Sequence, residues 1–207
     1  MKAYDFDKTI LKGNSICRFF LYCLVRFPYL LLFLPIQGVT CLLYFCKLIS
    51  KDKQLQILES FIAFVPKKQK TLCKFWDKNF KHVQSWYLQQ RESDDLIISA
   101  SPLFVVQEAC RRLGVQCIAS DYDVNAAKLN GRHCYGYEKV VQYKAMFGDK
   151  VVDEFYSDSL SDLPMLKLAK KGYLVKGDKV TLCYLDGKCV IDIDEERYQN
   201  KLKWQLK

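Results

Sequence analysis

Hydrophobic residues are distributed unevenly along the first quarter of this chain. Residues 2–6 form a short, largely apolar run that predicts a buried strand. From Ile16 to Ser50 the chain is almost continuously apolar, and the 20 residues from Phe27 to Cys46 carry no charge, enough for ~30 Å of helix. Because proline and glycine interrupt helices, Pro35–Gly38 predicts the turn of a helical hairpin. The two arms of that hairpin are expected at residues 16–34 and 36–49.

Beyond residue 50 the pattern becomes mixed. Apolar residues recur at helical spacing as far as Gln90, and Pro66 divides this stretch into two predicted helices, 52–64 and 67–90. Short apolar runs then alternate with amphipathic stretches, which predict strands at 95–99, 115–119, 152–156 and 173–175 and helices at 102–113, 139–147 and 163–170. Repeated strand and helix units predict an α/β fold with a doubly wound parallel, Rossmann-like sheet.

Two glycine turns add local detail to this pattern. Asn130-Gly131 predicts the turn of a small excursion over residues 121–136. Residues 180–194 alternate between apolar and polar positions around Asp186-Gly187, which is a strong hairpin signal. We therefore expect the sheet to be followed by a C-terminal β-hairpin.

Positive charge is concentrated in one segment. The 207-residue chain has a formal net charge of +9, and the 35 residues from Lys47 to Lys81 hold nine lysines against three acidic residues, a net of +6. No zinc-ligand spacing or aromatic RNA-binding motif accompanies this charge, so we expect no nucleic-acid partner. The segment directly follows the apolar stretch, which favours an anionic membrane surface as its partner. A solvated helical face is the alternative.

The cysteines indicate a reducing environment. There are ten, without a C-x-x-C pattern, and four of them lie in the apolar stretch, where cysteine behaves as a small hydrophobe. We expect reduced thiols and a cytoplasmic location.

Two carboxylates, Asp5 and Asp7, lie where the first predicted strand ends. Alternate side chains of a strand share a face, although the two can diverge into separate roles once the chain turns. Carboxylates this close repel each other unless a proton or cation separates them, and a hard ion such as Mg²⁺ is the usual solution. Taken alone, the pair also fits an ordinary acidic surface. Further polar candidates follow at Ser99, Lys139, Asp158 and Asp162.

Four short stretches together resemble a known set of motifs. They are DFDKT with Asp5, LIISASP with Ser99, GYEKV with Lys139, and YSDSLSDLPML with Asp158 and Asp162. In this order they resemble the four motifs of the haloacid dehalogenase superfamily of aspartate-based phosphatases, over residues 2 to about 175. The finer form resembles the phosphoserine-phosphatase-like branch, and the long apolar insertion looks most like the phosphatidylglycerophosphatase C type of lipid phosphatase. The chain departs from the family at Val175–Asp178, where related enzymes have a V-N-P-like stretch.

The resemblance assigns two roles to the first motif. Asp5 would be the nucleophile that forms an acyl-phosphate, and Asp7 would be the general acid for the leaving alkoxide and then the base for water. Mg²⁺ is the implied cofactor, with Asp5, the backbone carbonyl of Asp7, and Asp158 as its ligands.

The later motifs would hold the phosphoryl group. Ser99 would donate a hydrogen bond to its oxygens and Lys139 would supply a positive charge. Lys144 is the rival for the lysine role, and Lys139 is preferred because it matches the G-x-x-K form of the motif. Asp162 would anchor the metal shell or Lys139, and together with Asp158 it also fits a simple helix cap. Neither histidine, His82 nor His133, is assigned a catalytic role.

The resemblance also divides the chain into domains. Residues 1–14 and 91–207 would form the catalytic core, and 15–90 a helical cap inserted after the first strand, with the apolar hairpin at about 16–49. Since Asp5 and Ser99 must meet in one site, membrane crossings between them must be even in number. Short arms carrying Arg18 and Arg26 favour shallow insertion, with the catalytic domain at the cytoplasmic face.

The leading hypothesis is therefore a phosphatase that removes the terminal phosphate of phosphatidylglycerophosphate or a related lipid at a membrane surface. The alternative is a soluble phosphatase of a small phosphomonoester such as phosphoserine, with the hairpin folded into the cap or a dimer interface. A third hypothesis is a catalytically idle membrane scaffold. The sequence leaves the oligomeric state open.

Overall fold

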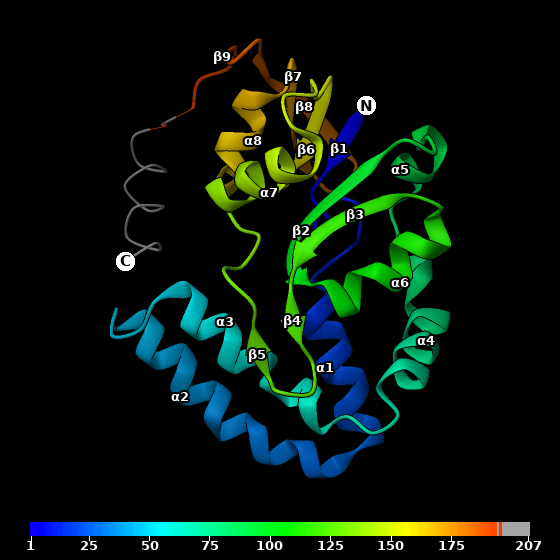
Figure 1. The fold of residues 1–207 in the computed structure, drawn as a ribbon, viewed down its shortest axis with the longest axis vertical. Helices are drawn as coiled ribbons and strands as arrows, with labels where there is room; N and C mark the ends of the chain where they lie inside the picture. Colours follow the sequence, from blue (N-terminus) through cyan, green and yellow to red (C-terminus); the bar gives the residue numbers. More distant parts are fainter. Residues whose placement is uncertain (194, 196–207) are drawn as a thin grey trace.

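The computed structural model describes residues 1–193 and 195 and contains a seven-stranded sheet (Figure 1). The strand order is β3-β2-β1-β6-β7-β8-β9, with the N-terminal strand β1 in the middle. The first five strands in that order are parallel, and β8 and β9 are antiparallel to their neighbours. The strands are β1 (Lys2–Tyr4), β2 (Leu96–Pro102), β3 (Gln116–Ser120), β6 (Glu154–Ser157), β7 (Lys171–Lys176), β8 (Lys179–Leu185) and β9 (Lys188–Cys189).

Helices cover both faces of this sheet (Figure 1). Between β1 and β2 the chain forms α1 (Ser15–Arg26), η1 (Pro28–Leu32), α2 (Phe33–Phe45), α3 (Lys51–Glu59), η2 (Ser60–Phe64), α4 (Lys68–Asn79), η3 (Phe80–His82) and α5 (Ser85–Gln90). After β2 come α6 (Leu103–Leu113), the hairpin β4 (Tyr122–Asp123) and β5 (Lys128–Leu129), α7 (Tyr137–Phe147), η4 (Leu160–Asp162) and α8 (Leu163–Leu168).

Alternation along the strands creates two apolar cores. Tyr4 and Ile97 face one cluster, which includes side chains of α1, α4 and α6, whereas Ala3 and Ile98 face the other, which is covered by α7 and α8. Adjacent residues of one strand point to opposite faces, so a strand buried on both sides must be apolar throughout. The predicted doubly wound α/β fold is confirmed. The assignment of 15–90 to a separate cap remains a prediction, since α1 and α4 share the first core.

The predicted turn of the apolar hairpin was wrong. Helix α2 runs through Pro35 and Gly38, because Pro35 lies in the first helical turn, where a backbone N–H has no partner to lose. The chain instead turns at Phe27, whose φ of −135° and ψ of 79° are not helical. Phe27 precedes Pro28, and a proline disfavours the helical conformation of the residue before it.

The predicted helix over residues 67–90 was also too long. It is interrupted at Val83 and Gln84, which have extended backbones. The Gln84 backbone N–H donates to the Ile10 carbonyl at 2.8 Å, and its side-chain amide donates to the Thr9 carbonyl at 2.8 Å. Contact with the loop after β1 therefore replaces the local helical hydrogen bonds.

The two glycine turns had different outcomes. Asp186-Gly187, with φ values of 46° and 75°, connects β8 to β9 as predicted, although Asp194 lies outside the described residues. Asn130-Gly131 follows β5 rather than forming the turn between β4 and β5. Asp123 Oδ1 accepts from the backbone N–H groups of Asn125 and Ala126, so this Asx turn reverses the chain earlier.

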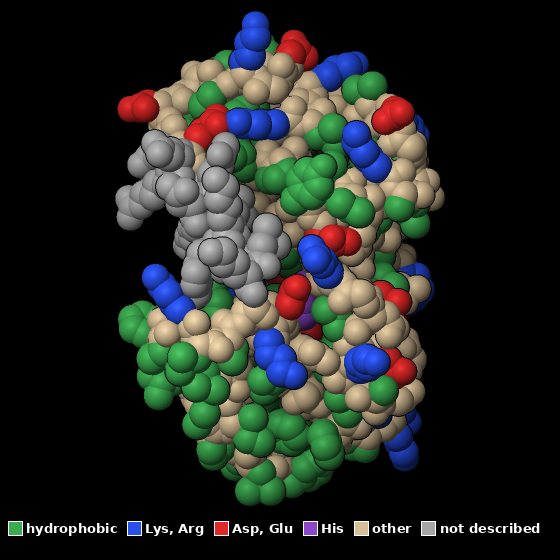
Figure 2. All heavy atoms as spheres, turned by 60° about the vertical axis from the view of Figure 1, so that its left-hand side comes forward, with side chains coloured by type: hydrophobic (Ala, Val, Ile, Leu, Met, Phe, Trp, Pro, Cys, Tyr) green, Lys and Arg blue, Asp and Glu red, His purple; other side chains and the backbone are tan. Residues whose placement is uncertain are grey.

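The apolar insertion is only partly buried. Helix α1 packs Phe19, Phe20 and Cys23 into the core. In contrast, Thr40 is the only buried residue of α2, and Pro28–Phe45 is the one segment of the described chain that is long and apolar enough to cross a membrane, with 11% of it buried. Figure 2 shows hydrophobic side chains gathered at the lower end of the molecule, where α2 lies in Figure 1. The exposed large side chains are Leu21, Val25, Tyr29, Leu31, Leu32, Leu34, Ile36, Val39, Leu42, Phe45 and Leu48.

A buried histidine joins α3 to the segment that leads into α7. His133 Nδ1 lies 3.0 Å from Asp52 Oδ1 and its Nε2 lies 3.1 Å from Glu59 Oε2, and both carboxylates belong to α3. Burial lowers the pKa of His133, but hydrogen bonds and charge from Asp52 and Glu59 outweigh it and raise the pKa to about 9. The imidazolium is therefore the stable form at neutral pH, and each ring nitrogen donates to a carboxylate.

This ion cluster predicts how stability depends on pH. A histidine pKa raised above its unfolded value stabilises the fold fully below about pH 6.5, and that stabilisation, up to about 3 kcal/mol, is lost as pH rises through about 9. We expect His133→Gln to lower the free energy of unfolding at pH 7 and to differ little from wild type at pH 10, as measured by urea denaturation. His82→Gln is the matched control, and equal stability of wild type and His133→Gln at pH 7 would contradict the prediction.

Candidate active site

All six residues singled out in the sequence line one cavity of about 290 Å³. Asp5 directly follows β1, Ser99 lies in β2, and Asp158 directly follows β6. Because these three strands are adjacent and parallel, their carboxyl ends meet at one edge of the sheet, where ligands bind in folds of this kind. Lys139 and Asp162 reach the same point from α7 and η4.

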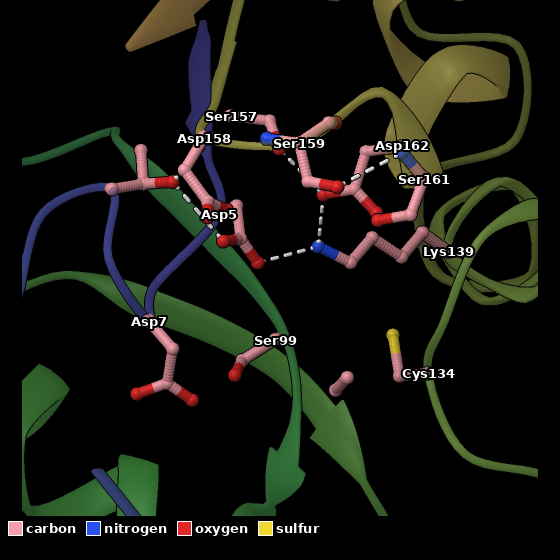
Figure 3. Close-up of polar contacts among 12 residues, drawn as sticks. Asp5, Asp7, Ser99, Cys134, Lys139, Ser157, Asp158, Ser159, Ser161 and Asp162 are labelled. Carbon is pink, nitrogen blue, oxygen red and sulfur yellow. Dashed lines mark hydrogen bonds and ion pairs between the residues drawn. The ribbon is translucent and has the colours of Figure 1, made fainter. Parts of the chain in front are cut away.

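A buried lysine connects the first motif to the last. Lys139 Nζ donates to Asp5 Oδ1 at 2.6 Å and to Asp162 Oδ2 at 2.7 Å (Figure 3). Burial lowers the pKa of Lys139, but the charges of Asp162 and Asp5 outweigh it and hold the pKa above its usual value. Ser157 Oγ donates to Asp162 Oδ2 at 2.8 Å and fixes that carboxylate. The rival Lys144 is half exposed and lies 3.9 Å from the fully exposed Asp149.

A threonine orients the second oxygen of Asp5. Thr9 Oγ1 donates to Asp5 Oδ2 at 3.1 Å and accepts from the Asp158 backbone N–H at 2.8 Å. One buried hydroxyl therefore ties the carboxylate after β1 to the segment after β6. Asp5 has both oxygens held and remains at the surface of the cavity, with 8% of the residue exposed.

Asp7 occupies a different environment from Asp5. Its carboxyl group points away from Asp5 in Figure 3 and accepts from the Ser15 backbone N–H at 2.6 Å and from Ser101 Oγ at 2.5 Å. Burial raises the pKa of Asp7 to about 6, although the hydrogen bonds from Ser101 and Ser15 oppose the shift. A carboxyl group with this pKa can give and take a proton near neutrality, whereas Asp5 is paired with a cation.

The donor set at the edge of the sheet fits a hard cation. Burial, together with the charges of Asp5 and Asp162, raises the pKa of Asp158 to about 7, so this carboxylate lacks sufficient positive charge nearby. No group of three His, Cys, Asp or Glu side chains suited to a metal occurs in the described part of the chain. The expected set has two carboxylates, Asp5 and Asp158, with the Asp7 carbonyl as the third oxygen. All three ligands are oxygen atoms, which is the set that Mg²⁺ prefers.

Several polar residues at the site were not predicted from the sequence. Ser101 could have been found, because it lies two residues after Ser99 on β2 and two residues along a strand share a face. Ser99 Oγ also accepts from the Ser101 backbone N–H at 3.1 Å. Lys8, within the first motif, also reaches the cavity, and other side chains reach it from segments that carry no motif, namely Asn14, Lys51, Glu59 and Tyr135.

Comparison with known proteins agrees with this geometry. The family model for haloacid dehalogenase-like hydrolases matches residues 3–167. The chain therefore belongs to the haloacid dehalogenase-like hydrolase family. No match was found among curated proteins.

Two solved structures resemble the fold. A protein with unknown function from Bordetella pertussis Tohama I has a TM-score of 0.68 and 17% sequence identity, covering 83% of this chain and 87% of that one. A phosphoserine phosphohydrolase-like protein from Francisella tularensis subsp. tularensis SCHU S4 has a TM-score of 0.51 and 16% identity, covering 83% and 86%. At these identities the likeness supports the fold alone.

Proposed function

We propose that this protein is a Mg²⁺-dependent phosphatase that acts through a phosphorylated Asp5. The main support is the position of Asp5 Oδ1, held 2.6 Å from a buried ammonium group at the edge of a cavity that Asp7, Ser99 and Asp158 also line. A lysine so placed fixes the orientation of the Asp5 carboxylate, as a nucleophile requires. The hydroxyl of Ser99 faces the same cavity and serves as a donor to the phosphoryl oxygens.

The reaction divides between the two carboxylates. An Asp5 oxygen forms a bond to phosphorus, the ester P–O bond breaks, and the leaving alkoxide takes the proton of Asp7. In the second half, Asp7 removes a proton from water, whose oxygen attacks the phosphorus and releases inorganic phosphate and free Asp5. Bound Mg²⁺ would neutralise charge on the phosphoryl oxygens. The pKa of Asp7, about 6, suits both proton transfers.

Substitution of the two carboxylates tests this division. Asp5→Asn is expected to abolish turnover of p-nitrophenyl phosphate without unfolding the chain, because the amide cannot form the acyl-phosphate. Asp7→Asn should slow turnover by ~10²–10⁴-fold and leave phosphorylated Asp5 detectable by intact-mass spectrometry. Asp149→Asn, at a fully exposed side chain, is the control. Activity of Asp5→Asn within tenfold of wild type would exclude Asp5 as the nucleophile.

Chelation tests the metal. Treatment with EDTA should stop hydrolysis of p-nitrophenyl phosphate and added Mg²⁺ should restore it, because the proposed ligands are all oxygen atoms. Zinc should not substitute well, since it favours cysteine and histidine ligands that this site lacks among the described residues. Full activity after exhaustive chelation would contradict the assignment.

We further propose that the substrate is phosphatidylglycerophosphate or a related lipid phosphate, hydrolysed at the cytoplasmic face of a membrane. The support is the exposed apolar surface of η1 and α2, which in water would cost roughly 25 cal/mol for each Å² left uncovered. Exposed lysines follow this surface in α3 and α4, including Lys53, Lys70 and Lys74. A cover of acyl chains beside anionic head groups satisfies both features.

One observation supports the alternative function, a soluble phosphatase of a small phosphomonoester. A cavity of about 290 Å³ accommodates a head group or a compact metabolite, so a soluble phosphatase of a small phosphomonoester such as phosphoserine fits the site equally well. In that case the apolar surface would be covered by a second copy of the chain. All ten cysteines are free thiols, in keeping with a cytoplasmic catalytic site under either proposal.

Vesicle binding separates these alternatives. Replacing Val39, Leu42 and Phe45 with glutamine removes exposed apolar side chains of α2 and should release the protein from phosphatidylglycerol vesicles in a flotation assay. Activity on the lipid should fall far more than activity on p-nitrophenyl phosphate, because the chemistry lies elsewhere. The same replacement at Val141, Met146 and Val151, which are also exposed, is the control. A wild-type protein that is soluble without detergent and indifferent to anionic vesicles would exclude the lipid proposal.

A further inference from the structure

Helix α3 forms one wall of the catalytic cavity. Lys51, Leu55 and Glu59 line the cavity, and because they are spaced by four residues they lie along one stripe of the helix. None of the three has a role in the reaction steps proposed above. The position of α3 instead determines how closely this wall approaches a bound phosphate ester.

His133 ties this wall to the segment that carries the catalytic lysine. Asp52 and Glu59 lie about two turns apart on α3, and the two nitrogens of one imidazole ring reach both carboxylates. His133 lies between β5 and α7, and Lys139 is in the first turn of α7 (Figure 1). The ring therefore joins α3 to the part of the chain that reaches the phosphoryl site.

The residue after His133 is anchored to the sheet. The backbone N–H of Cys134 donates to Ser120 Oγ at 2.9 Å, and Ser120 Oγ donates to the Ala100 carbonyl at 2.7 Å. Ala100 directly follows Ser99 on β2. One short segment is thus bonded on one side to α3 and on the other to the strand that supplies the proposed phosphoryl donor.

Burial makes α3 dependent on His133. His133 is 1% exposed and Glu59 is 2% exposed. Burial raises the pKa of Glu59, and the hydrogen bond and charge of His133 oppose that shift. Without the imidazolium, the buried carboxylate would have to take up a proton or turn toward water. Because Glu59 borders the cavity, either response changes the wall of the substrate site.

We propose that His133 is a positioning residue for substrate binding, which fixes α3 as one wall of the catalytic cavity. The proposal rests on the phosphatase function and deepens it. Asp5, Asp7 and Lys139 are held by hydrogen bonds that involve neither α3 nor His133. Loss of His133 should therefore raise KM and leave kcat nearly unchanged.

Kinetics on p-nitrophenyl phosphate test this role. We expect His133→Gln to raise KM by about 10-fold and to change kcat by less than about 2-fold. Glu59→Gln should have a similar effect. The double variant should raise KM no further than either single one, because the two side chains act as one pair. His82→Gln, at the other histidine, is the matched control and should behave as wild type.

Hydrogen exchange follows α3 without relying on turnover. His133→Gln should speed amide exchange in residues 51–59 and leave exchange in β2 as in wild type. Asp52→Asn removes one of the two bonds at a side chain that is 46% exposed, so this milder variant should show the same pattern to a smaller degree. A uniform rise in exchange along the chain would indicate general destabilisation and would overturn the positioning role.

The pH dependence tests the role in the wild-type protein. Besides Asp52 and Glu59, the charged and titratable groups around His133 are Lys51 on α3, Tyr122 on β4, and Arg132, Tyr135, Tyr137 and Glu138 along the segment into α7. All of them are present in His133→Gln, so a difference between the two pH profiles reports the imidazole. Its pKa is raised to about 9, and above that pH one ring nitrogen no longer donates. We expect the KM of wild type to rise as pH increases through about 9, and the KM of His133→Gln to lack this step.

The outcomes separate this proposal from the phosphatase function. A rise in KM, with faster exchange confined to α3, supports the positioning role. An unchanged KM, a loss confined to kcat, or additive effects of His133→Gln and Glu59→Gln would overturn it and leave the phosphatase function intact. If the wild-type protein hydrolyses no phosphate ester, the phosphatase function fails, and exchange alone then decides whether His133 fixes α3.

Discussion

The buried ammonium group of Lys139 is the interaction on which the site depends. Removing a lysine from water costs several kcal/mol, and the two carboxylates at 2.6 and 2.7 Å offset that cost. Asp5 follows the central strand, Lys139 lies in the first turn of α7, and Asp162 ends η4. The three groups therefore fix three separate segments relative to one another. The contribution of Lys139 to the site therefore lies in placing Asp5.

Small hydroxyl side chains then separate the two acids of the first motif. Thr9 donates to Asp5, which also accepts from the Lys139 ammonium group. Ser15 and Ser101 donate to Asp7, which points away from Asp5. Two carboxylates only two residues apart would otherwise repel each other. Here one is fixed by an ammonium group and the other by neutral donors in a buried setting that raises its pKa to about 6. This asymmetry supports the proposed division into nucleophile and proton carrier.

The sequence predicts those features that depend on local pattern. Apolar runs placed the strands of the sheet, and the motifs placed Asp5, Ser99 and Asp158 on or directly after strands that prove adjacent. The third motif placed Lys139, which reaches the same cavity from α7. Features set by distant contacts were missed. His133 lies 81 residues from Asp52 and 74 from Glu59, so no local signal marks their cluster.

Between β1 and β2, one wrong helix prediction also results from a distant contact. The helix interruption at Gln84 exists because the chain there bonds to the loop after β1, about 75 residues earlier. The prediction of a turn at Pro35 failed for a different reason. The effect of a proline depends on its position in the helix, and because the chain already turns at Phe27, Pro35 falls in the first turn of α2. A proline therefore predicts the end of a helix only where it would fall in the helix interior, since it is tolerated in the first turn.

The path of the insertion also limits how the protein can meet a membrane. Phe19, Phe20 and Cys23 fix α1 in the core, so this helix cannot serve as the second arm of a membrane-crossing hairpin without leaving the fold. Only η1 and α2 remain available, and a single crossing there would separate Asp5 from Ser99, which line the same cavity. Under the proposed function, α2 would therefore lie along the surface of the bilayer with its apolar side chains in the acyl region.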